Sequence, residues 1–390
     1  MRSWLPAVLG GLVVVRVALD LAWVPLGLAQ AVTVGMGALA AGVALSKDGA
    51  AVDHALRWPV AGLLAWSVLA GVRGVELEPL RHGLHLWLPL IWLLAAPRAD
   101  PRWPRWLVGA ALVPIGASLL ALALGQPADH VLHDIPRLHG AYRNLHGHAV
   151  AMAVFVVVGA WLAAEDDDPR WRWLGGGVAA LASVCLVATW VRTLLIFVAL
   201  ALATMLLLAR AWRALGGLAA AGLLALLASP RLQDRFADLA SVLTLTPPEA
   251  GWGALGSWRL RIWLESWQGW VAGPPHTLLL GRGLGGHVGL HRHLDPHHEY
   301  LSLLFQLGPV GLALWLTLAV SALVLCVRAR SSAGRLGAGL LVAVLITNGL
   351  SNEWLSRATL QWVTWGAVAL ALGRRSGCRA DGATSPPRTA

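Results

Sequence analysis

Apolar segments recur along the whole chain and are separated by short polar connections. Runs of about 18 apolar residues or more are typical of helices that cross a lipid bilayer. We predict about twelve such spans. They are expected at residues 4–21, 25–46, 57–72, 83–97, 105–125, 146–164, 173–190, 193–209, 213–229, 298–327, 336–351 and 356–373. The pattern therefore predicts an all-α polytopic membrane protein.

These spans divide the chain into four parts. Residues 1–229 hold the first nine spans, residues 230–297 form one long loop, and residues 298–373 hold the last three spans. Residues 374–390 form a polar tail that we expect to be disordered. Because soluble domains carry roughly 25% charged residues, a content of 13% charged and 57% hydrophobic residues supports the membrane assignment.

The long loop carries two predicted surface helices. Leu232, Phe236, Leu239 and Leu243 recur at helical spacing, which predicts an amphipathic helix on the membrane surface. In the second helix, SWRLRIWLESWQGW, tryptophans stand at positions 263, 267 and 270. Such a stripe usually anchors a helix at the membrane interface, and a platform for stacking sugars is the alternative.

The connections between spans carry a charge asymmetry. The positive-inside rule places the shorter, basic connections and both termini in the cytoplasm, with about 17 basic and 8 acidic residues there against about 12 and 11 outside. The net charge of +10 thus follows from topology and does not indicate nucleic-acid binding. Of the fourteen histidines, only His54 falls on the cytoplasmic side. Most polar chemistry is therefore expected to face outward.

Few features point to metals, disulfides or intramembrane chemistry. Cys185, Cys326 and Cys378 form no CxxC pair, so a disulfide framework or thiolate metal site is not expected. The histidine run does not match the HExxH zinc pattern, and we expect no metal and no cofactor. Arg16 and Asp20 are four residues apart in the first span, which favours an internal ion pair and leaves a functional pair open.

The stretch DPHHEYLSLLFQLGPVGLALW combines acid, proline and two histidines with the start of an apolar span. Asp295 is suited to cap a helix, and Pro296 to its first position. His297 and His298 would then lie in the first turn, where the helix dipole favours anions and lowers imidazole pKa values. A neutral imidazole beside an anion site is a candidate general base. Glu299 would either orient an imidazole or be a solvated acid.

Outer arginines are candidates for binding an anion. Arg261 has Glu265 four residues further on, so the two side chains are expected to pair. Arg259 has no such neighbour. Arg192 lies in the short turn TWVRTLL between two apolar spans, where a charge needs a specific partner.

Four of these elements together resemble the O-antigen ligase family, over roughly Arg137 to Trp315. A family pattern of histidine, polar residue, nine residues and GxxG is matched from His297 to Gly311, with His298 where the family has Asn, Ser or Gln. ATWVRTLL is similar to a family element that points to Arg192, and SWRLRIW to one that points to Arg259, with Arg261 close by. RLHGAYRNLHGHA is similar to a further segment and implicates Arg137, Arg143, Asn144 and His148.

The resemblance implies a GT-C-like glycosyltransferase fold in the inner membrane of a Gram-negative bacterium, with the long loop and the active site in the periplasm. The family transfers a glycan from undecaprenyl pyrophosphate to a sugar hydroxyl of lipid A-core during lipopolysaccharide biosynthesis, without a metal. Its partners would be these two substrates and membrane lipids. Arg192, Arg259, Arg261 and Arg137 would bind the pyrophosphate. His297 or His298 would deprotonate the acceptor for an inverting attack.

Three alternatives stay open at this point. An O-antigen polymerase uses the same donor with another lipid-linked glycan as acceptor, and a protein O-oligosaccharyltransferase uses a protein. A transporter would bind its cargo near the bilayer midplane with intramembrane polar groups. Because Arg16 and Asp20 are the main such groups, a transporter is the least favoured.

Overall fold

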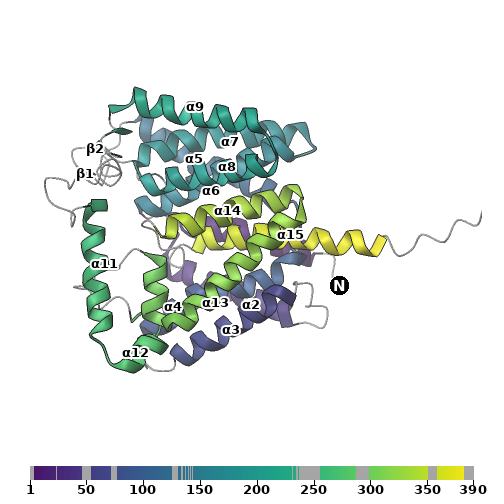
Figure 1. The fold of residues 1–390 in the computed structure, drawn as a ribbon. Coiled ribbons are helices and arrows are strands. Elements are labelled where there is room, and N and C mark those ends of the chain that lie inside the picture. The colour runs from purple at the N-terminus through teal and green to yellow at the C-terminus, as the bar shows by residue number, and fades with distance from the viewer. Residues whose placement is uncertain are drawn as a thin grey trace, which may run out of the picture.

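A computed structural model of the chain describes residues 4–22, 24–45, 54–71, 77–124, 131–132, 135–136, 138, 140, 142, 144–230, 232–233, 236, 255–286, 298–349 and 358–381. Within these ranges nearly every element is a helix (Figure 1). The helices are α1 (Leu5–Ala18), α2 (Leu26–Leu45), α3 (His54–Gly71), α4 (Leu77–Ala95), the short 3-10 helix η1 (Ala96–Arg98), α5 (Trp103–Ala123), α6 (Leu145–Glu165), α7 (Pro169–Thr189), α8 (Arg192–Leu208), α9 (Trp212–Ala228), α11 (Leu255–Val271), α12 (Pro275–Leu280), α13 (Glu299–Ala329), α14 (Ser332–Asn348) and α15 (Ala358–Asp381).

Several of these helices are long and apolar enough to cross a membrane. Five meet both criteria in the described residues: Gly27–Leu45, Trp103–Ala123, Leu145–Glu165, Pro169–Thr189 and Glu299–Ala329. Six shorter apolar helices accompany them. The protein is therefore a helical membrane-spanning protein, as its apolar pattern predicts. A helix also occupies each of the twelve predicted segments, although the number that cross a bilayer stays a prediction.

Two short strands form the one β-ladder among the described residues. β1 (Val131–Leu132) and β2 (Ile135–Pro136) pair antiparallel, with Val131 opposite Pro136. They belong to the connection between α5 and α6.

The bundle is layered around α6. Residues on every side of this helix are buried, from Leu145 to Leu162, so its uniformly apolar sequence is explained by a central position. At the rim, α9 has no buried residue, and Leu223, Leu224 and Leu227 are exposed. In a membrane protein such leucines are suited to face lipid.

Glycine lets α6 and α7 approach closely. A Cβ atom built on Gly159 would lie 2.7 Å from the carbonyl oxygen of Gly175, and one on Gly175 would lie 2.7 Å from that of Gly159. Only hydrogen fits between the two backbones, which is the way small residues bring membrane helices together.

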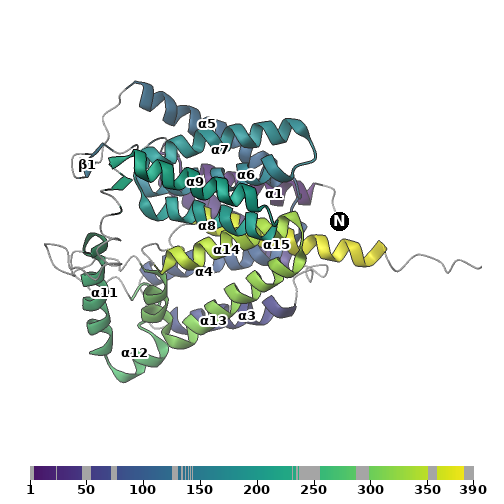
Figure 2. The ribbon, with the colours of Figure 1, turned by 45° about the horizontal axis from the view of Figure 1, so that its top comes forward.

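α13 is broken at Gly308. This residue has φ 67° and ψ −177°, a conformation that glycine adopts far more easily than other residues. Figures 1 and 2 show the first part of α13 standing apart in direction from the second. The predicted span 298–327 is therefore two segments, and residues 309–329 have by themselves the length of about 20 residues that a span needs.

The break frees backbone carbonyl groups, and neighbouring segments satisfy them. The amide of Arg282 donates to the carbonyl of Phe305 (2.7 Å), and the amide of Gly283 donates to that of Gln306 (3.0 Å). The indole of Trp66, in α3, donates to the carbonyl of Leu307 (2.7 Å). Irregular backbone inside a membrane protein needs such partners, so the break is a fixed part of the fold.

One end of the bundle is covered by α11, which runs across the direction of the bundle helices in Figures 1 and 2. We call this the α11 end. The first turns of α6, α8, α13 and α15 lie toward it, as do the last turns of α1, α7 and α14, because consecutive helices run in opposite directions.

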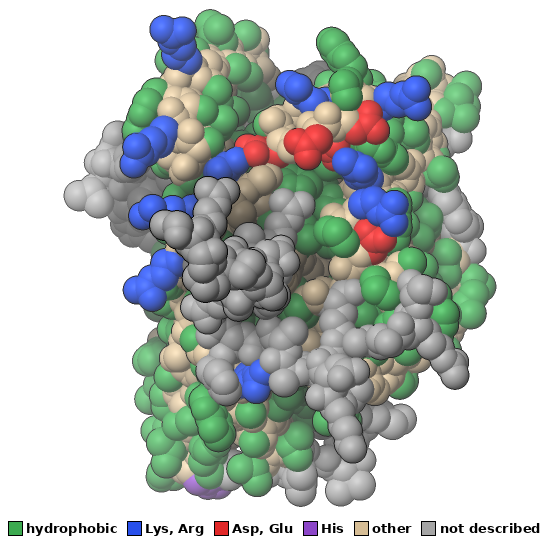
Figure 3. Space-filling model, turned by 90° about the vertical axis from the view of Figure 1, so that its right-hand side faces the viewer, with side chains coloured by type: hydrophobic (Ala, Val, Ile, Leu, Met, Phe, Trp, Pro, Cys, Tyr) green, Lys and Arg blue, Asp and Glu red, His purple; other side chains and the backbone are tan. Residues whose placement is uncertain are grey.

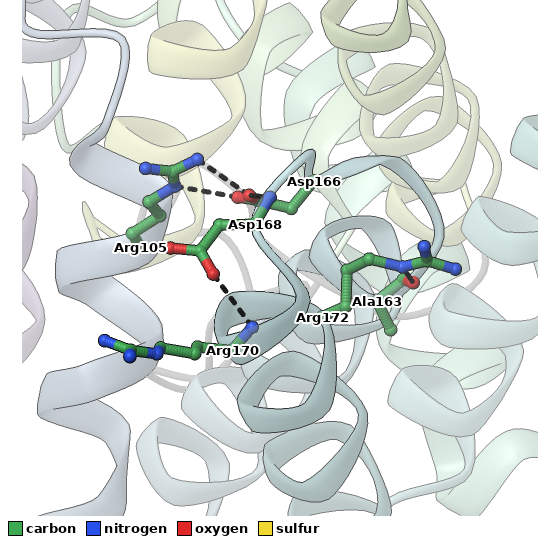
Figure 4. A network of polar contacts seen from close by, with 6 residues as sticks. All are labelled: Arg105, Ala163, Asp166, Asp168, Arg170 and Arg172. Atoms are coloured by element: carbon green, nitrogen blue, oxygen red, sulfur yellow. Dashed lines mark hydrogen bonds and ion pairs between the residues drawn. The ribbon is translucent and has the colours of Figure 1, made fainter.

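The opposite end carries ionic pairs, and Figure 3 shows arginine and acidic side chains gathered there. Arg105 forms two hydrogen bonds with Asp166 (2.7 and 2.8 Å), as Figure 4 shows, and Arg335 pairs with Glu165 (2.5 Å). Burial raises the pKa of Asp166, but the hydrogen bonds from Arg105 and from the amide of Asp168 outweigh it, so the pKa is lowered. These pairs connect α5 and α14 to the α6–α7 turn.

The expected disorder of residues 374–390 stays a prediction, although the last helix extends into this segment. α15 continues to Asp381, because the segment GRRSGCRAD contains no proline to end the helix. Residues 382–390 lie outside the described residues.

Candidate functional site

His298 is the N-cap of α13. Its backbone is extended, with φ −144° and ψ 106°, and its Nδ1 accepts a hydrogen bond from the amide of Leu301 (3.3 Å). The expectation that Asp295 caps this helix and Pro296 opens it is therefore wrong, since α13 begins at Glu299. Asp295, Pro296 and His297 lie outside the described residues.

The cap fixes the tautomer of the His298 ring. An imidazole nitrogen that accepts a hydrogen bond carries no proton, so in the neutral ring the proton is on Nε2. Burial lowers the pKa of His298, against a smaller raising effect of its own backbone carbonyl. Near neutral pH the ring is therefore uncharged and presents Nε2–H as a hydrogen-bond donor.

α11 packs against this first part of α13. Trp263 meets the ring of His298 edge-on, with centroids 4.7 Å apart, and Trp270 lies 5.7 Å from Phe305. Trp270 is buried, whereas Trp267 is 44% exposed. The three tryptophans are thus not one lipid-facing stripe: Trp263 and Trp270 face α13, and Trp267 lies on the exposed side of α11.

Arg192 lies close enough to Arg259 to affect the pKa of that side chain. Burial lowers the pKa of Arg259, and the positive charge of Arg192 lowers it further. Both side chains are half-buried, although they come from helices α8 and α11, which are far apart in sequence. Two like charges in a partly desolvated place favour an anion between them, so this pair is a candidate anion site.

Arg192 is held by a tight turn. Trp190 ends α7 in the left-handed conformation (φ 54°), and α8 begins at Arg192 after only Val191. This confirms the short turn predicted from TWVRTLL. The guanidinium is therefore attached to the N-terminus of α8, where the helix dipole also favours anions.

Arg261 does not join this pair. It forms an ion pair with Glu265 (2.7 Å), as the i, i+4 spacing predicts, and its side chain is 55% exposed. An exposed pair of this kind leaves Arg261 on the outer side of α11, away from the candidate anion site.

The segment before α6 contributes one cap and one buried imidazole. Asn144 is the N-cap of α6, and its Oδ1 accepts a hydrogen bond from the amide of Gly147 (2.6 Å). His148 is fully buried and lies 5.7 Å from Tyr142 between ring centroids. Asn144 therefore caps α6 and His148 is buried in its first turn, whereas Arg137 and Arg143 fall outside the residues whose side chains are described.

Glu299 is fully buried, which excludes the interpretation as a solvated first-turn acid. At the first position of α13 its carboxylate also lies at the favourable end of the helix dipole.

Buried polar residues in the bundle gather at the α11 end. They lie in the halves of the helices nearest to it, and the set is Arg16, Ser67, Ser118, His148, Thr189, Thr193, Glu299, Ser302, Gln306, Thr347, Asn348, Thr359, Gln361 and Thr364. Asp100, between η1 and α5, is a buried polar residue at the opposite end. Polar groups buried at membrane depth are costly and are usually kept for function. The α11 end is therefore the end at which chemistry is expected.

No group of three or more His, Cys, Asp and Glu side chains is arranged to hold a metal ion within the described ranges. His287, His291 and His293, from the histidine-rich loop, are outside those ranges.

Comparison with known proteins adds no assignment: no family model matches the chain, and no curated protein matches it.

Sequence patterns did not reveal two side chains of this region. Trp263 is next to His298 only because α11 folds back onto α13, which no local spacing indicates. Tyr142 is buried beside Asp20 and His148. It is one of only two tyrosines in the chain, and this rarity was the one signal available.

Proposed function

We propose that the protein is an O-antigen ligase, which transfers a glycan from undecaprenyl pyrophosphate to a sugar hydroxyl of lipid A-core. The observation that carries the proposal is the proximity of Arg192 and Arg259, half-buried on different helices at the α11 end. The sequence resemblance picks out these same two residues by independent motifs. A pyrophosphate is an anion of suitable size and charge for two guanidinium groups.

In the proposed reaction the acceptor hydroxyl attacks the anomeric carbon of the donor glycan. The bond from that carbon to the phosphate oxygen breaks, and undecaprenyl pyrophosphate leaves with the negative charge. Arg192 and Arg259 stabilise this charge as it develops, which is worth more in a partly desolvated place than in water. Attack from the side opposite the leaving group inverts the anomeric configuration.

His297 is the proposed general base, and His298 has a different role. A base needs a free lone pair on the nitrogen that faces the substrate. In His298, Nδ1 accepts from Leu301, so in the neutral ring Nε2 carries the proton and donates. The Asn, Ser or Gln found here in the resembled family are also polar residues, and Asn and Ser are good N-caps. His298 therefore caps α13 and leaves the proton to His297.

The proposal also fixes the orientation of the protein. The α11 end faces the periplasm, both termini are cytoplasmic, and about twelve helices cross the inner membrane in a GT-C-like arrangement. Support comes from the arginine-rich ionic pairs at the opposite end, which suit the cytoplasmic side.

The test is transfer by purified protein in detergent, with an undecaprenyl-pyrophosphate-linked glycan and lipid A-core as substrates. We expect capped lipid A-core from the wild-type protein. Arg192→Ala, Arg259→Ala and His297→Ala should each lower the rate by at least about a hundredfold. Arg261→Ala is the matched control on α11 and should stay within about twofold, because that side chain is exposed and paired.

Equal rates for Arg259→Ala and Arg261→Ala would contradict the assignment of the anion site. Product that grows on the lipid-linked donor, with lipid A-core left unmodified, would instead indicate a polymerase, and product on an added protein would indicate an oligosaccharyltransferase.

A further inference from the structure

A second polar group lies at the α11 end and has no part in the proposed reaction. Arg16 donates from Nη2 to Oδ1 of Asp20 (2.9 Å), which confirms the predicted ion pair. Oδ2 of Asp20 also accepts a hydrogen bond from the hydroxyl of Thr359 (2.6 Å). Asp20 therefore joins the end of α1 to the first turn of α15.

Tyr142 lies beside this pair. Its backbone forms an isolated antiparallel bridge with Leu21, the residue after Asp20. The side chain is only 1% exposed, and its hydroxyl has no hydrogen-bond partner among the described residues. The Asp20 carboxylate and, more strongly, burial raise the pKa of the phenol, so it stays protonated and able to donate.

Besides the Tyr142 hydroxyl, Arg16 has a donor without a hydrogen-bond partner among the described residues. Its Nε is buried and has no partner within the described part of the chain, and the residue is 8% exposed. Buried donors without partners are rare because they lose water and gain nothing in return. Arg16 and Tyr142 therefore each bring a buried donor without a partner among the described residues, which a ligand would satisfy.

The charges of Arg16 and Asp20 indicate which kind of ligand fits this group of residues. Arg16 and Asp20 cancel, so the group attracts neither a phosphate nor a cation, unlike the pair Arg192 and Arg259. Asp20 keeps acceptor capacity on both oxygens, and its side chain is 33% exposed. Acceptors and donors side by side without net charge suit vicinal hydroxyl groups, which both donate and accept.

We propose that Arg16, Asp20 and Tyr142 form a subsite for sugar hydroxyls. The inference rests on the proposed function and adds the place where a sugar, rather than the pyrophosphate, is bound. The segment before Tyr142 contacts the segment before Arg192, because the amide of Leu138 donates to the carbonyl of Ala188 in the last turn of α7 (3.0 Å). The sugar belongs either to the donor glycan or to lipid A-core, which share this chemistry.

The two tyrosines of the chain give a matched test. The hydroxyl of Tyr300 donates to the carbonyl of Leu345, whereas that of Tyr142 has no partner among the described residues. Tyr142→Phe should leave the thermal midpoint unchanged or slightly raised, and Tyr300→Phe should lower it. Tyr142→Phe and Asp20→Asn should raise KM for one of the two substrates by about three- to tenfold. The affected substrate identifies the source of the sugar.

The possible results distinguish a failure of the sugar subsite from a failure of the proposed reaction. Transfer with KM values for donor and acceptor unchanged in Tyr142→Phe overturns the subsite alone, as does a fall in its thermal midpoint equal to that of Tyr300→Phe. If the wild-type protein transfers nothing, direct binding of lipid A-core and of the lipid-linked glycan is measured by thermophoresis. Binding that Tyr142→Phe weakens then supports the subsite and overturns the proposed reaction, and binding that it leaves unchanged overturns both.

Discussion

At the scale of single residues, the backbone position of His298 determines the role of its side chain. The extended backbone before α13 places Nδ1 over the first turn, where it satisfies the amide of Leu301. The same hydrogen bond decides which nitrogen carries the proton. His298 is thereby a helix cap whose second ring nitrogen is a hydrogen-bond donor.

His298→Asn is expected to keep the fold and the transfer activity, because asparagine is a good N-cap. His298→Ala should lower the free energy of unfolding by about 1 kcal/mol, the usual value of a cap. Chemical denaturation of both variants in the same detergent measures the difference. Equal stability of the alanine and asparagine variants would show that the side chain does not cap α13.

The lowered pKa of His298 also predicts a pH dependence. The unfolded ring has a pKa of about 6.5 and the folded ring a lower one, so the unfolded chain binds this proton more readily. The stability that His298 contributes is fully present above about pH 6.5 and is lost as the pH falls toward the folded pKa. The thermal midpoint of the wild type should therefore fall more between about pH 7 and about pH 5 than that of His298→Asn. If the thermal midpoints of the two proteins fell in parallel with pH, this prediction would be contradicted.

Local spacing predicted the pairs that lie within one helix. Arg16 with Asp20 and Arg261 with Glu265 are four residues apart, and helical geometry alone brings them together. The contact of Trp263 with His298 joins α11 to α13 across a long loop, and no period in the sequence encodes it. The proximity of Arg192 to Arg259 could be expected only through the family resemblance.

At the scale of elements, the broken helix α13 positions the candidate site. Gly308 separates a first part that carries His298 and packs on α11 from a second part that runs through the bundle. The glycine pattern GPVG marked this place in the sequence, but the direction of the first part depends on hydrogen bonds from Arg282, Gly283 and Trp66. Those partners are distant in sequence and could not be predicted.

Gly308→Ala tests the break. A Cβ there would lie 2.1 Å from the carbonyl oxygen of Leu279, at φ 67°. We expect a loss of at least about 2 kcal/mol in stability together with loss of transfer. Gly216→Ala in α9 is the control, because its Cβ would meet nothing within 4 Å, and it should be neutral. A stable, active Gly308→Ala protein would show that the break is dispensable.

At the scale of the whole molecule, the two ends of the bundle are chemically different. Buried polar side chains, two neighbouring arginines and a helix lying across the bundle mark the α11 end. Arginine–carboxylate pairs mark the other. Apolar length was enough to predict the helices of the bundle, since it reflects the thickness of a bilayer. The central position of α6 and the rim position of α9 depend on packing between helices and were not encoded in length.

Labelling with a membrane-impermeant maleimide tests the orientation. In a Cys378→Ser background, in which Cys185 and Cys326 are buried, Gln268→Cys on α11 should be labelled from the periplasmic side of intact spheroplasts. Arg170→Cys, at the opposite end, should react only after the membrane is opened. The reverse pattern would place the α11 end in the cytoplasm.

The most direct measurement of the central claim is an experimental map of the protein with a non-reactive analogue of an undecaprenyl-pyrophosphate-linked glycan. The diphosphate is expected between the guanidinium groups of Arg192 and Arg259, with the anomeric carbon of the analogue within reach of His297. A diphosphate bound away from both arginines would contradict the account, as would a map in which the two arginines point into separate compartments.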